Sequence, residues 1–335
     1  MINVNNILNI FFKNDKFVVP VWFLRQSGRH IPEYFELRKQ ETNFINFCLN
    51  TELIVKSTKL PLKYYNLDAA IVFSDILMIP WAVNRKVDFI KGIGPKLEPM
   101  LPNETKILKN IDIFNKLKPL KDSMSILRNE LPKSKSLIGF AGAPWTILVY
   151  MINQQSPKKQ LKKDFFENKD LINNVLLIIE KFLKIHIKNQ IDSGANVIQI
   201  FDSWAGLLEN KDLPYYVYNP TFNLVKFIQS LNVPVICFPR NIKDYKKYCD
   251  FIKPDAICID YEIDPLLIRK EIKIPVQGGM DPKILLTDKE TIKAEAKKYL
   301  DIFKDHPYIF NLGHGVLPET DPGMMDYLVK TVKDY

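Results

Sequence analysis

The chain has 335 residues, of which 47% are hydrophobic and 25% charged, a composition that fits a globular protein and excludes collagen, a coiled coil and extensive disorder. Lysine and arginine outnumber aspartate and glutamate by 47 to 38, and the net charge of +9 fits a lysine-rich surface as well as binding to nucleic acid, an anionic membrane or a small polyanion. No apolar run approaches the roughly 18 residues that span a bilayer, no targeting signal is evident, and the four cysteines form no CxxC pair, so we expect a cytoplasmic protein without a disulfide framework or zinc knuckle.

Eight short apolar runs recur along the chain, each rich in β-branched or aromatic residues. They are Phe17–Phe23, Ala69–Phe73, Ser136–Ala141, Asn196–Phe201, Val233–Phe238, Ala256–Asp260, Ile274–Gln277 and Tyr308–Leu312. The runs are nearly continuous in apolar residues and do not alternate with polar ones, which is typical of parallel strands covered by helices on both faces.

Helical patterns separate these runs. The clearest spans Leu171 to Ile191, where apolar residues repeat at helical spacing and Gly194 supplies a stop. Alternating strands and helices of this number favour an α/β fold closed as a (β/α)₈ TIM-type barrel over an open doubly wound sheet. The first two connections are unusually long and no linker or repeat divides the chain, so we expect one somewhat distorted barrel domain over residues 1–335, with long early βα loops.

The carboxyl ends of the strands are where such a barrel carries its chemistry. Seven of the 12 glycines follow predicted strands, which fits a pocket floor made of tight turns. Arg25 and Arg29 follow the first run, and with Arg38 they are three of only seven arginines, against 40 lysines. Because a guanidinium binds carboxylates or phosphates through a bidentate fork, this grouping indicates an anion-binding site, although the pair at 25 and 29 also fits ordinary surface charges.

Four further polar residues follow predicted strands and are candidates for binding or catalysis: Asp75, Tyr150, Ser203 and His314. Asp75 stands where burial is expected, and a buried carboxylate is costly unless it is hydrogen-bonded or paired. His314 lies between two glycines near the expected barrel mouth. Ordinary roles are open to all four: helix capping for Asp75 and Ser203, packing for Tyr150, and a plain loop position for His314.

Several common motifs are absent from the sequence. There is no GxGxxG after a strand, no GxxxxGK[ST], no HExxH and no GxSxG. The histidines and cysteines are scattered, which gives a zinc-dependent methyltransferase barrel poor support. The remaining inventory of arginine, carboxylate, hydroxyl and imidazole points to an anionic substrate and to chemistry without a cofactor or a metal.

Seven segments carry a family resemblance. They read PVWFLRQSGRHIPEY, LDAAIVFSDIL, GFAGAPWTILVYM, IQIFDSWAG, PVICFPR, QGGMDP and YIFNLGHGVLPETDP. In content, order and spacing they resemble the uroporphyrinogen decarboxylases, the cofactor-independent tetrapyrrole decarboxylases of haem biosynthesis. The resemblance covers nearly the whole chain. It implies a single distorted (β/α)₈ barrel, a homodimer with facing active-site clefts, a tetrapyrrole polycarboxylate as substrate, and neither nucleic acid nor membrane as partner.

The resemblance also implies an activity and site residues. The activity is removal of CO₂ from the four acetate arms of uroporphyrinogen III to give coproporphyrinogen III. Asp75 is the implied central catalytic carboxylate, with Arg25 and Arg29 acting beside it, and the general acid stays open. The implied substrate-binding residues are Arg25, Gln26, Ser27, Gly28, Arg29, Arg38, Asp75, Tyr150, Ser203 and His314.

The sequence departs from the family pattern at three positions within the seven segments. His30 replaces a usual tyrosine, Ser27 replaces a usual alanine, and Gly279 replaces a usual asparagine, which bears on fine substrate positioning. Two alternatives remain: a corrinoid or zinc methyltransferase built on a related barrel, and a protein that binds a tetrapyrrole, a polyanion or nucleic acid without turnover.

Overall fold

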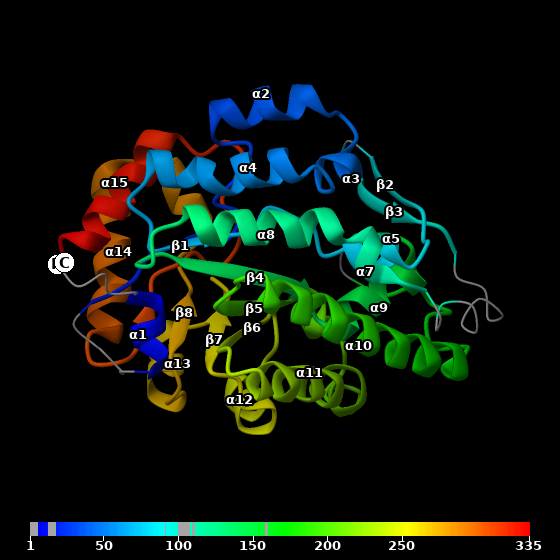
Figure 1. The fold of residues 1–335 in the computed structure, drawn as a ribbon. Coiled ribbons are helices and arrows are strands. Elements are labelled where there is room, and N and C mark those ends of the chain that lie inside the picture. Colours follow the sequence, from blue (N-terminus) through cyan, green and yellow to red (C-terminus); the bar gives the residue numbers. More distant parts are fainter. Residues whose placement is uncertain (1–5, 13–17, 91, 100–107, 109–110, 158–159) are drawn as a thin grey trace.

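The computed structural model describes residues 6–12, 18–90, 92–99, 108, 111–157 and 160–335. At its centre lies a parallel sheet in the strand order β1-β4-β5-β6-β7-β8-β9 (Figure 1). The strands are β1 (Ala69–Ile71), β4 (Ser136–Gly142), β5 (Val197–Asp202), β6 (Val235–Pro239), β7 (Ala256–Ile259), β8 (Val276–Gly278) and β9 (Tyr308–Ile309). Each strand is buried on both faces, as its apolar sequence predicts.

The segment before β1 occupies an eighth position, between β9 and β1. Val21 forms a parallel bridge with Phe310, and the Phe310 N–H donates to Pro20 O at 2.8 Å. On the other side, the Asp68 N–H donates to Val21 O at 2.8 Å. The sheet therefore curls round to meet itself, and the predicted barrel is confirmed. Pairing here is limited to a bridge, so the ring is distorted at this point, and Phe17 of the first predicted strand lies outside the described residues.

The last strand, β9, ends at Ile309, three residues earlier than predicted. The reason is Asn311, whose side-chain oxygen accepts hydrogen bonds from Leu24 N at 2.9 Å and from its neighbour Leu312 N at 2.8 Å. Pairing with the preceding strand position resumes in a bridge between Met280 and Leu312. A polar side chain thus interrupts the ladder in order to bind the turn that follows the first strand position.

Helices run back along the outside of the barrel after each strand position (Figure 1). In chain order the returning helices are α4 (Thr51–Tyr64), α8 (Lys118–Glu130), α10 (Lys169–Asp192), α11 (Asn219–Ser230), α12 (Tyr245–Ile252), α13 (Pro265–Glu271), α14 (Lys289–Phe303) and α15 (Pro322–Lys333). The first two connections are long, as predicted, because they carry extra elements. In the first connection these are α2 (Pro32–Gln40) and α3 (Phe44–Phe47), and in the second they are α5 (Met78–Ala82), β2 (Val87–Ile90), β3 (Gly94–Leu97) and α7 (Ile113–Lys116). Outside these two connections, α1 (Asn6–Phe12) precedes the first strand position, and α9 (Pro144–Asn153), η1 (Ala205–Leu207), η2 (Pro214–Tyr218) and η3 (Pro282–Leu286) lie in later connections.

The interior of the barrel contains a chain of polar side chains. Trp22 Nε1 donates to Gln277 Oε1 at 3.0 Å, and Gln277 Nε2 donates to Gln199 Oε1 at 3.1 Å. All three residues are fully buried. Hydrogen bonds in such a low-dielectric interior are strong, so the chain ties the eighth strand position to β8 and β5 across the barrel.

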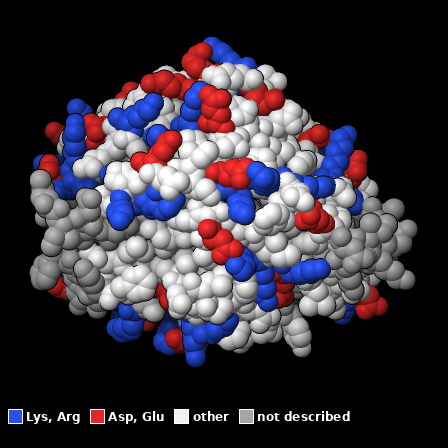
Figure 2. All heavy atoms as spheres, in the orientation of Figure 1, with Lys and Arg blue, Asp and Glu red and all other residues white. Residues whose placement is uncertain are grey.

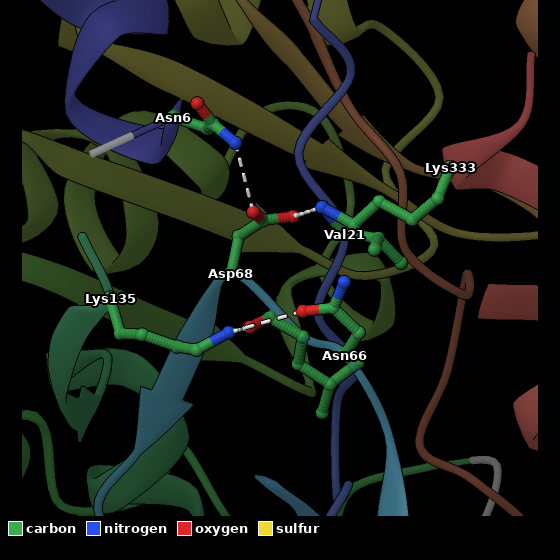
Figure 3. A network of polar contacts seen from close by, with 7 residues as sticks. Asn6, Val21, Asn66, Asp68, Lys135 and Lys333 are labelled. Carbon is green, nitrogen blue, oxygen red and sulfur yellow. Dashed lines mark hydrogen bonds and ion pairs between the residues drawn. The ribbon is translucent and has the colours of Figure 1, made fainter. Parts of the chain in front are cut away.

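The amino-terminal edge of the barrel is held by the buried carboxylate of Asp68 (Figure 3). One oxygen accepts from Val21 N at 2.7 Å and from Lys333 Nζ at 2.5 Å, and the other accepts from Asn6 Nδ2 at 3.0 Å. The Asp68 carbonyl accepts from Ser136 N at 3.0 Å. One residue therefore joins the eighth strand position, β4, α1 and α15.

The surface carries its charges as mixed, mostly local groups. On the face shown in Figure 2, lysine and arginine alternate with aspartate and glutamate. Many of the ion pairs join residues one helical turn apart, such as Lys188 with Asp192 at 2.6 Å. Among the described residues, no helix is long and apolar enough to cross a membrane.

We predict that Asp68→Ala lowers the free energy of unfolding by about 2–3 kcal/mol, because a buried N–H and an ammonium lose a charged acceptor. Urea denaturation measures the change. Asp326→Ala is the control, since it removes an exposed ion pair of 2.6 Å to Lys330 on α15 and is expected to cost less than about 0.5 kcal/mol. Equal losses in the two variants would contradict a special role for Asp68.

Candidate active site

The turn after the first strand position is clamped at Leu24. Its N–H donates to Asn311 Oδ1 at 2.9 Å, and its carbonyl accepts from Val316 N at 2.9 Å. The next residue, Arg25, has φ = +59°, a left-handed conformation that a residue with a side chain adopts only where its surroundings impose it. The last βα turn of the barrel thus fixes the direction in which Arg25 leaves the chain.

Gln26 and Ser27 are predicted to bind substrate, but their side chains point into the protein. Gln26 is fully buried, and its side chain accepts from Phe23 N at 3.1 Å and donates to Ala69 O at 3.1 Å. The Ser27 hydroxyl donates to Ser57 O at 2.6 Å. Both side chains hold the turn in place.

The aliphatic part of Arg25 packs on Gly315. A Cβ added at Gly315 would lie 2.4 Å from Arg25 Cδ and 2.7 Å from its Cγ. Glycine is therefore required at 315 by a close approach. In this position the guanidinium acts on the pKa of both Asp75 and His314.

Asp75 follows β1 and has one carboxylate oxygen bonded within the fold. Oδ1 accepts from Leu77 N at 2.8 Å in an Asx turn that leads into α5. The N-cap residue of α5 is Leu77, and no side chain caps this helix, so the Asp75 bond closes the turn before the helix and does not cap it. Within the described part of the chain, Oδ2 has no hydrogen-bond partner. Burial raises the pKa of Asp75, whereas the Leu77 N–H and the charge of Arg25 favour its ionised form.

Tyr150 lies on α9 and is buried, with its hydroxyl 3.4 Å from Ser156 Oγ and its ring edge-on to Trp204 at 6.0 Å. Burial raises the pKa of Tyr150, and the negative charge of Asp75 acts in the same direction. The phenol therefore stays protonated and keeps a hydrogen to donate.

His314 lies in the turn after β9 and is half-buried. Burial lowers its pKa to about 4, and the positive charges of Arg240 and Arg25 contribute. The imidazole is therefore neutral near neutral pH. A neutral ring adds no repulsion beside the two guanidinium groups and offers one donor and one acceptor.

Ser203 follows Asp202 at the end of β5 and is half-buried. Asp202 is buried, which raises its pKa to about 7, and its Oδ1 accepts from Thr146 Oγ1 at 2.6 Å. Thr146 Oγ1 in turn accepts from Trp204 N at 3.3 Å. The turn that carries Ser203 is thus fixed on both sides.

Arg38 is engaged by its own part of the chain. Its guanidinium donates to Glu41 O at 2.7 Å and to Thr42 O at 2.9 Å, and it lies 4.8 Å from the centre of the Phe47 ring. These contacts fasten the end of α2 to α3. Among the described residues, no hydrogen bond or ring contact joins Arg38 to Arg25.

Arg29 and Gly28 complete the predicted turn. Arg29 is exposed, and its charge acts on the Tyr34 phenol of α2. Gly28 lies close to the backbone, since a Cβ there would be 3.3 Å from Arg25 O. Two exposed arginines, Arg25 and Arg29, thus belong to the same turn.

Gly279, which replaces a usual asparagine, points into the protein. Its φ is +109°, and a Cβ there would lie 2.6 Å from Tyr299 Cε1 and 3.1 Å from Ile259 Cδ1. The Tyr299 hydroxyl donates to Gly279 O at 2.7 Å. The Tyr299 ring therefore fills the space next to this backbone.

Arg240 also lies at the mouth, although no motif match singled it out. It follows β6 directly, and its charge acts on His314. Its position in the sequence could have identified it as a site residue, because it is one of few arginines and comes immediately after a predicted strand.

The structure brings Arg25, Asp75, Tyr150 and His314 together from four distant parts of the chain. Among the described residues, Arg25, Arg29 and Arg240 form no ion pair with a carboxylate, and no cluster of histidine, cysteine, aspartate or glutamate has the geometry to hold a metal ion. Unpaired guanidinium groups suit an anionic ligand, and a carboxylate with one free oxygen can stabilise positive charge that develops near it.

The fold is similar to that of a solved methyltransferase from Methanosarcina mazei. The TM-score is 0.82 at 17% sequence identity, and the likeness covers 99% of this chain and 98% of that one. At this identity the likeness concerns the fold alone.

Sequence comparison identifies the family. A family model described as uroporphyrinogen decarboxylase (URO-D) matches residues 5–335. A uroporphyrinogen decarboxylase of Rickettsia bellii is 40% identical over 94% of this chain and 95% of its own, and one of Wolbachia pipientis wMel is 39% identical over 95% of this chain and 94% of its own. The chain therefore belongs to the uroporphyrinogen decarboxylase family.

Proposed function

We propose that this chain removes CO₂ from the four acetate arms of uroporphyrinogen III, giving coproporphyrinogen III, without a cofactor. The observation that carries the proposal is the Asp75 carboxylate: among the described residues one of its oxygens has no hydrogen-bond partner, and the positive charge of Arg25 favours its ionised form. The family membership favours this activity over a methyltransferase or a binding protein.

The pyrrole ring serves as the electron sink in this proposal. Protonation of a ring carbon makes the ring cationic, the bond to the carboxylate then breaks, CO₂ leaves, and the electron pair neutralises the ring as an exocyclic methylene. A second proton on that methylene makes the methyl group, and loss of the proton first added restores the aromatic pyrrole. Asp75, ionised, accepts hydrogen bonds from the inward pyrrole N–H groups and stabilises the cation.

The positive residues have a separate task. Arg25 and Arg29 bind carboxylate arms, and their lack of protein carboxylate partners leaves them available for this. Tyr150, Ser203 and His314 contact the substrate as hydrogen-bonding groups. Gln26, Ser27 and Gly28 shape the turn that lies next to the substrate. Arg38 contributes to substrate binding from the region where α2 meets α3. Homodimer formation and a cytoplasmic location are further parts of the proposal, and they rest on the family resemblance.

The direct test is anaerobic incubation with uroporphyrinogen III followed by mass spectrometry. We expect products that have lost successive CO₂ groups, with turnover unchanged after treatment with a metal chelator. Intact uroporphyrinogen after prolonged incubation, or turnover that depends on added zinc or corrinoid, would reject the proposal.

Asp75→Asn separates the two roles of this residue. The amide keeps an oxygen for Leu77 N but loses the negative charge, so we expect kcat to fall roughly 10²-fold or more while the melting temperature stays near that of the wild type. Asp75→Ala loses the oxygen as well and serves as the reference for the structural contribution. Turnover of Asp75→Asn at the wild-type rate would exclude an electrostatic role.

Gly315→Ala tests the placement of Arg25 without altering any charge. The added methyl group would collide with the Arg25 side chain, so we expect kcat/KM to fall about tenfold or more. In an Arg25→Ala background the same change is expected to have a much smaller effect, because the contacts to Cδ and Cγ are gone and only the 3.1 Å approach to Cβ remains. An equal loss in both backgrounds would show that Gly315 acts through another contact.

A further inference from the structure

Arg240 stands across the barrel mouth from Arg25. In the ring order, the segment of Val21 is followed by β1, β4, β5 and β6, so β6 lies at the fourth position along from the first strand position. In a ring of eight positions this is the opposite side. Arg240 comes directly after β6, at the edge of the barrel where Arg25 also emerges.

The backbone of Arg240 is fixed by its neighbours. Its N–H donates to Asp202 O at 3.0 Å, and its carbonyl accepts from Gly206 N at 3.1 Å. The next residue, Asn241, has φ = +60°, and its N–H donates to Asp260 Oδ2 at 2.9 Å. The side chain therefore leaves a rigid turn, which is what a residue that positions a ligand needs.

Two carboxylates belong to the turns that hold the Arg240 backbone, and neither forms an ion pair with its guanidinium. Asp202 Oδ1 accepts from Thr146 Oγ1, while its buried Oδ2 has no partner among the described residues. Asp260 accepts from Tyr245 Oη at 3.0 Å as well as from Asn241 N. Among the described residues Arg240 has no ion pair, and its buried Nε has no hydrogen-bond partner. A buried guanidinium N–H without an acceptor is costly, so a bound anion would relieve that cost.

His314 connects Arg240 with the site already described. The charges of Arg240 and of Arg25 both act on this imidazole, so both guanidinium groups lie in its neighbourhood. The half-buried Arg240 therefore faces the same mouth and not a separate surface.

We propose that Arg240 is a further substrate-binding residue, which grips a carboxylate arm on the rim of the macrocycle opposite to the arm held by Arg25. The inference rests on the proposed function. Guanidinium groups at two opposite edges hold the macrocycle over Asp75. A cluster of arginines at one edge alone does not achieve this. Acetate and propionate arms end in the same carboxylate, so either arm fits the guanidinium.

Steady-state kinetics of Arg240→Gln test this role. We expect KM for uroporphyrinogen III to rise about tenfold or more with a much smaller change in kcat, because a charge-assisted hydrogen bond to the substrate is lost. Arg240→Lys should recover part of the affinity, and Arg269→Gln, on the outer helix α13, should behave as wild type. An unchanged KM in Arg240→Gln would overturn the proposal, as would a loss confined to kcat.

A second substrate shows whether Arg240 binds an acetate arm or a propionate arm. A porphyrinogen with one remaining acetate and four propionates should show the same rise in KM if Arg240 binds a propionate. It should show a smaller rise if Arg240 binds an acetate.

A measurement on the wild-type protein covers the case in which a variant fails to fold. Phenylglyoxal modifies free guanidinium groups, and peptide mapping follows each arginine. We expect uroporphyrinogen to slow modification of Arg240 but not of Arg269, and an unprotected Arg240 at saturating substrate would overturn the proposal. Benzenehexacarboxylate is a second probe. If it protects Arg240 while the wild type turns over no uroporphyrinogen, the carboxylate site stands and the proposed function fails.

Discussion

The structure depends on the closure of its strand ring at Val21. This residue pairs with Phe310 on one side and with Asp68 on the other, and the Asp68 carboxylate adds a hydrogen bond to its N–H. This closure brings the turn that begins at Leu24 next to the last βα turn, where Leu24 bonds to Asn311 and Val316 and Arg25 packs on Gly315. The bonds at the amino-terminal edge therefore determine the geometry at the opposite, carboxyl edge, where barrels of this type carry their chemistry.

The site separates its charges in a consistent way. Within the described part of the chain, the guanidinium groups of Arg25, Arg29 and Arg240 form no ion pair with a carboxylate, whereas the half-buried Asp75 carboxylate keeps one oxygen without a hydrogen-bond partner. The groups between them stay uncharged, because burial lowers the pKa of His314 and raises that of Tyr150. Positive groups around one carboxylate suit the proposed substrate, a macrocycle that carries carboxylates on its rim and in which a pyrrole ring becomes cationic during the reaction.

Several residues singled out for binding also hold the fold. Gln26 and Ser27 bond to backbone groups, Arg38 closes the end of α2, and one oxygen of Asp75 is used by Leu77. A group proposed to bind must itself be held rigidly, so a structural bond and a proposed binding role fall on the same residue. A substitution at such a position therefore changes both, and only a variant that preserves the structural bond isolates the other role.

The sequence by itself determined the strand runs, the helix Lys169–Asp192 to within two residues, and the motifs that place Arg25 and Asp75 after strands. These features follow from local periodicity and from residue types, both of which can be read from a short stretch of sequence. Tertiary structure alone decided the early end of β9 at Asn311 and the position of Arg240 beside His314. Those features depend on contacts between segments far apart in the chain, and no local pattern records which distant group a side chain will meet.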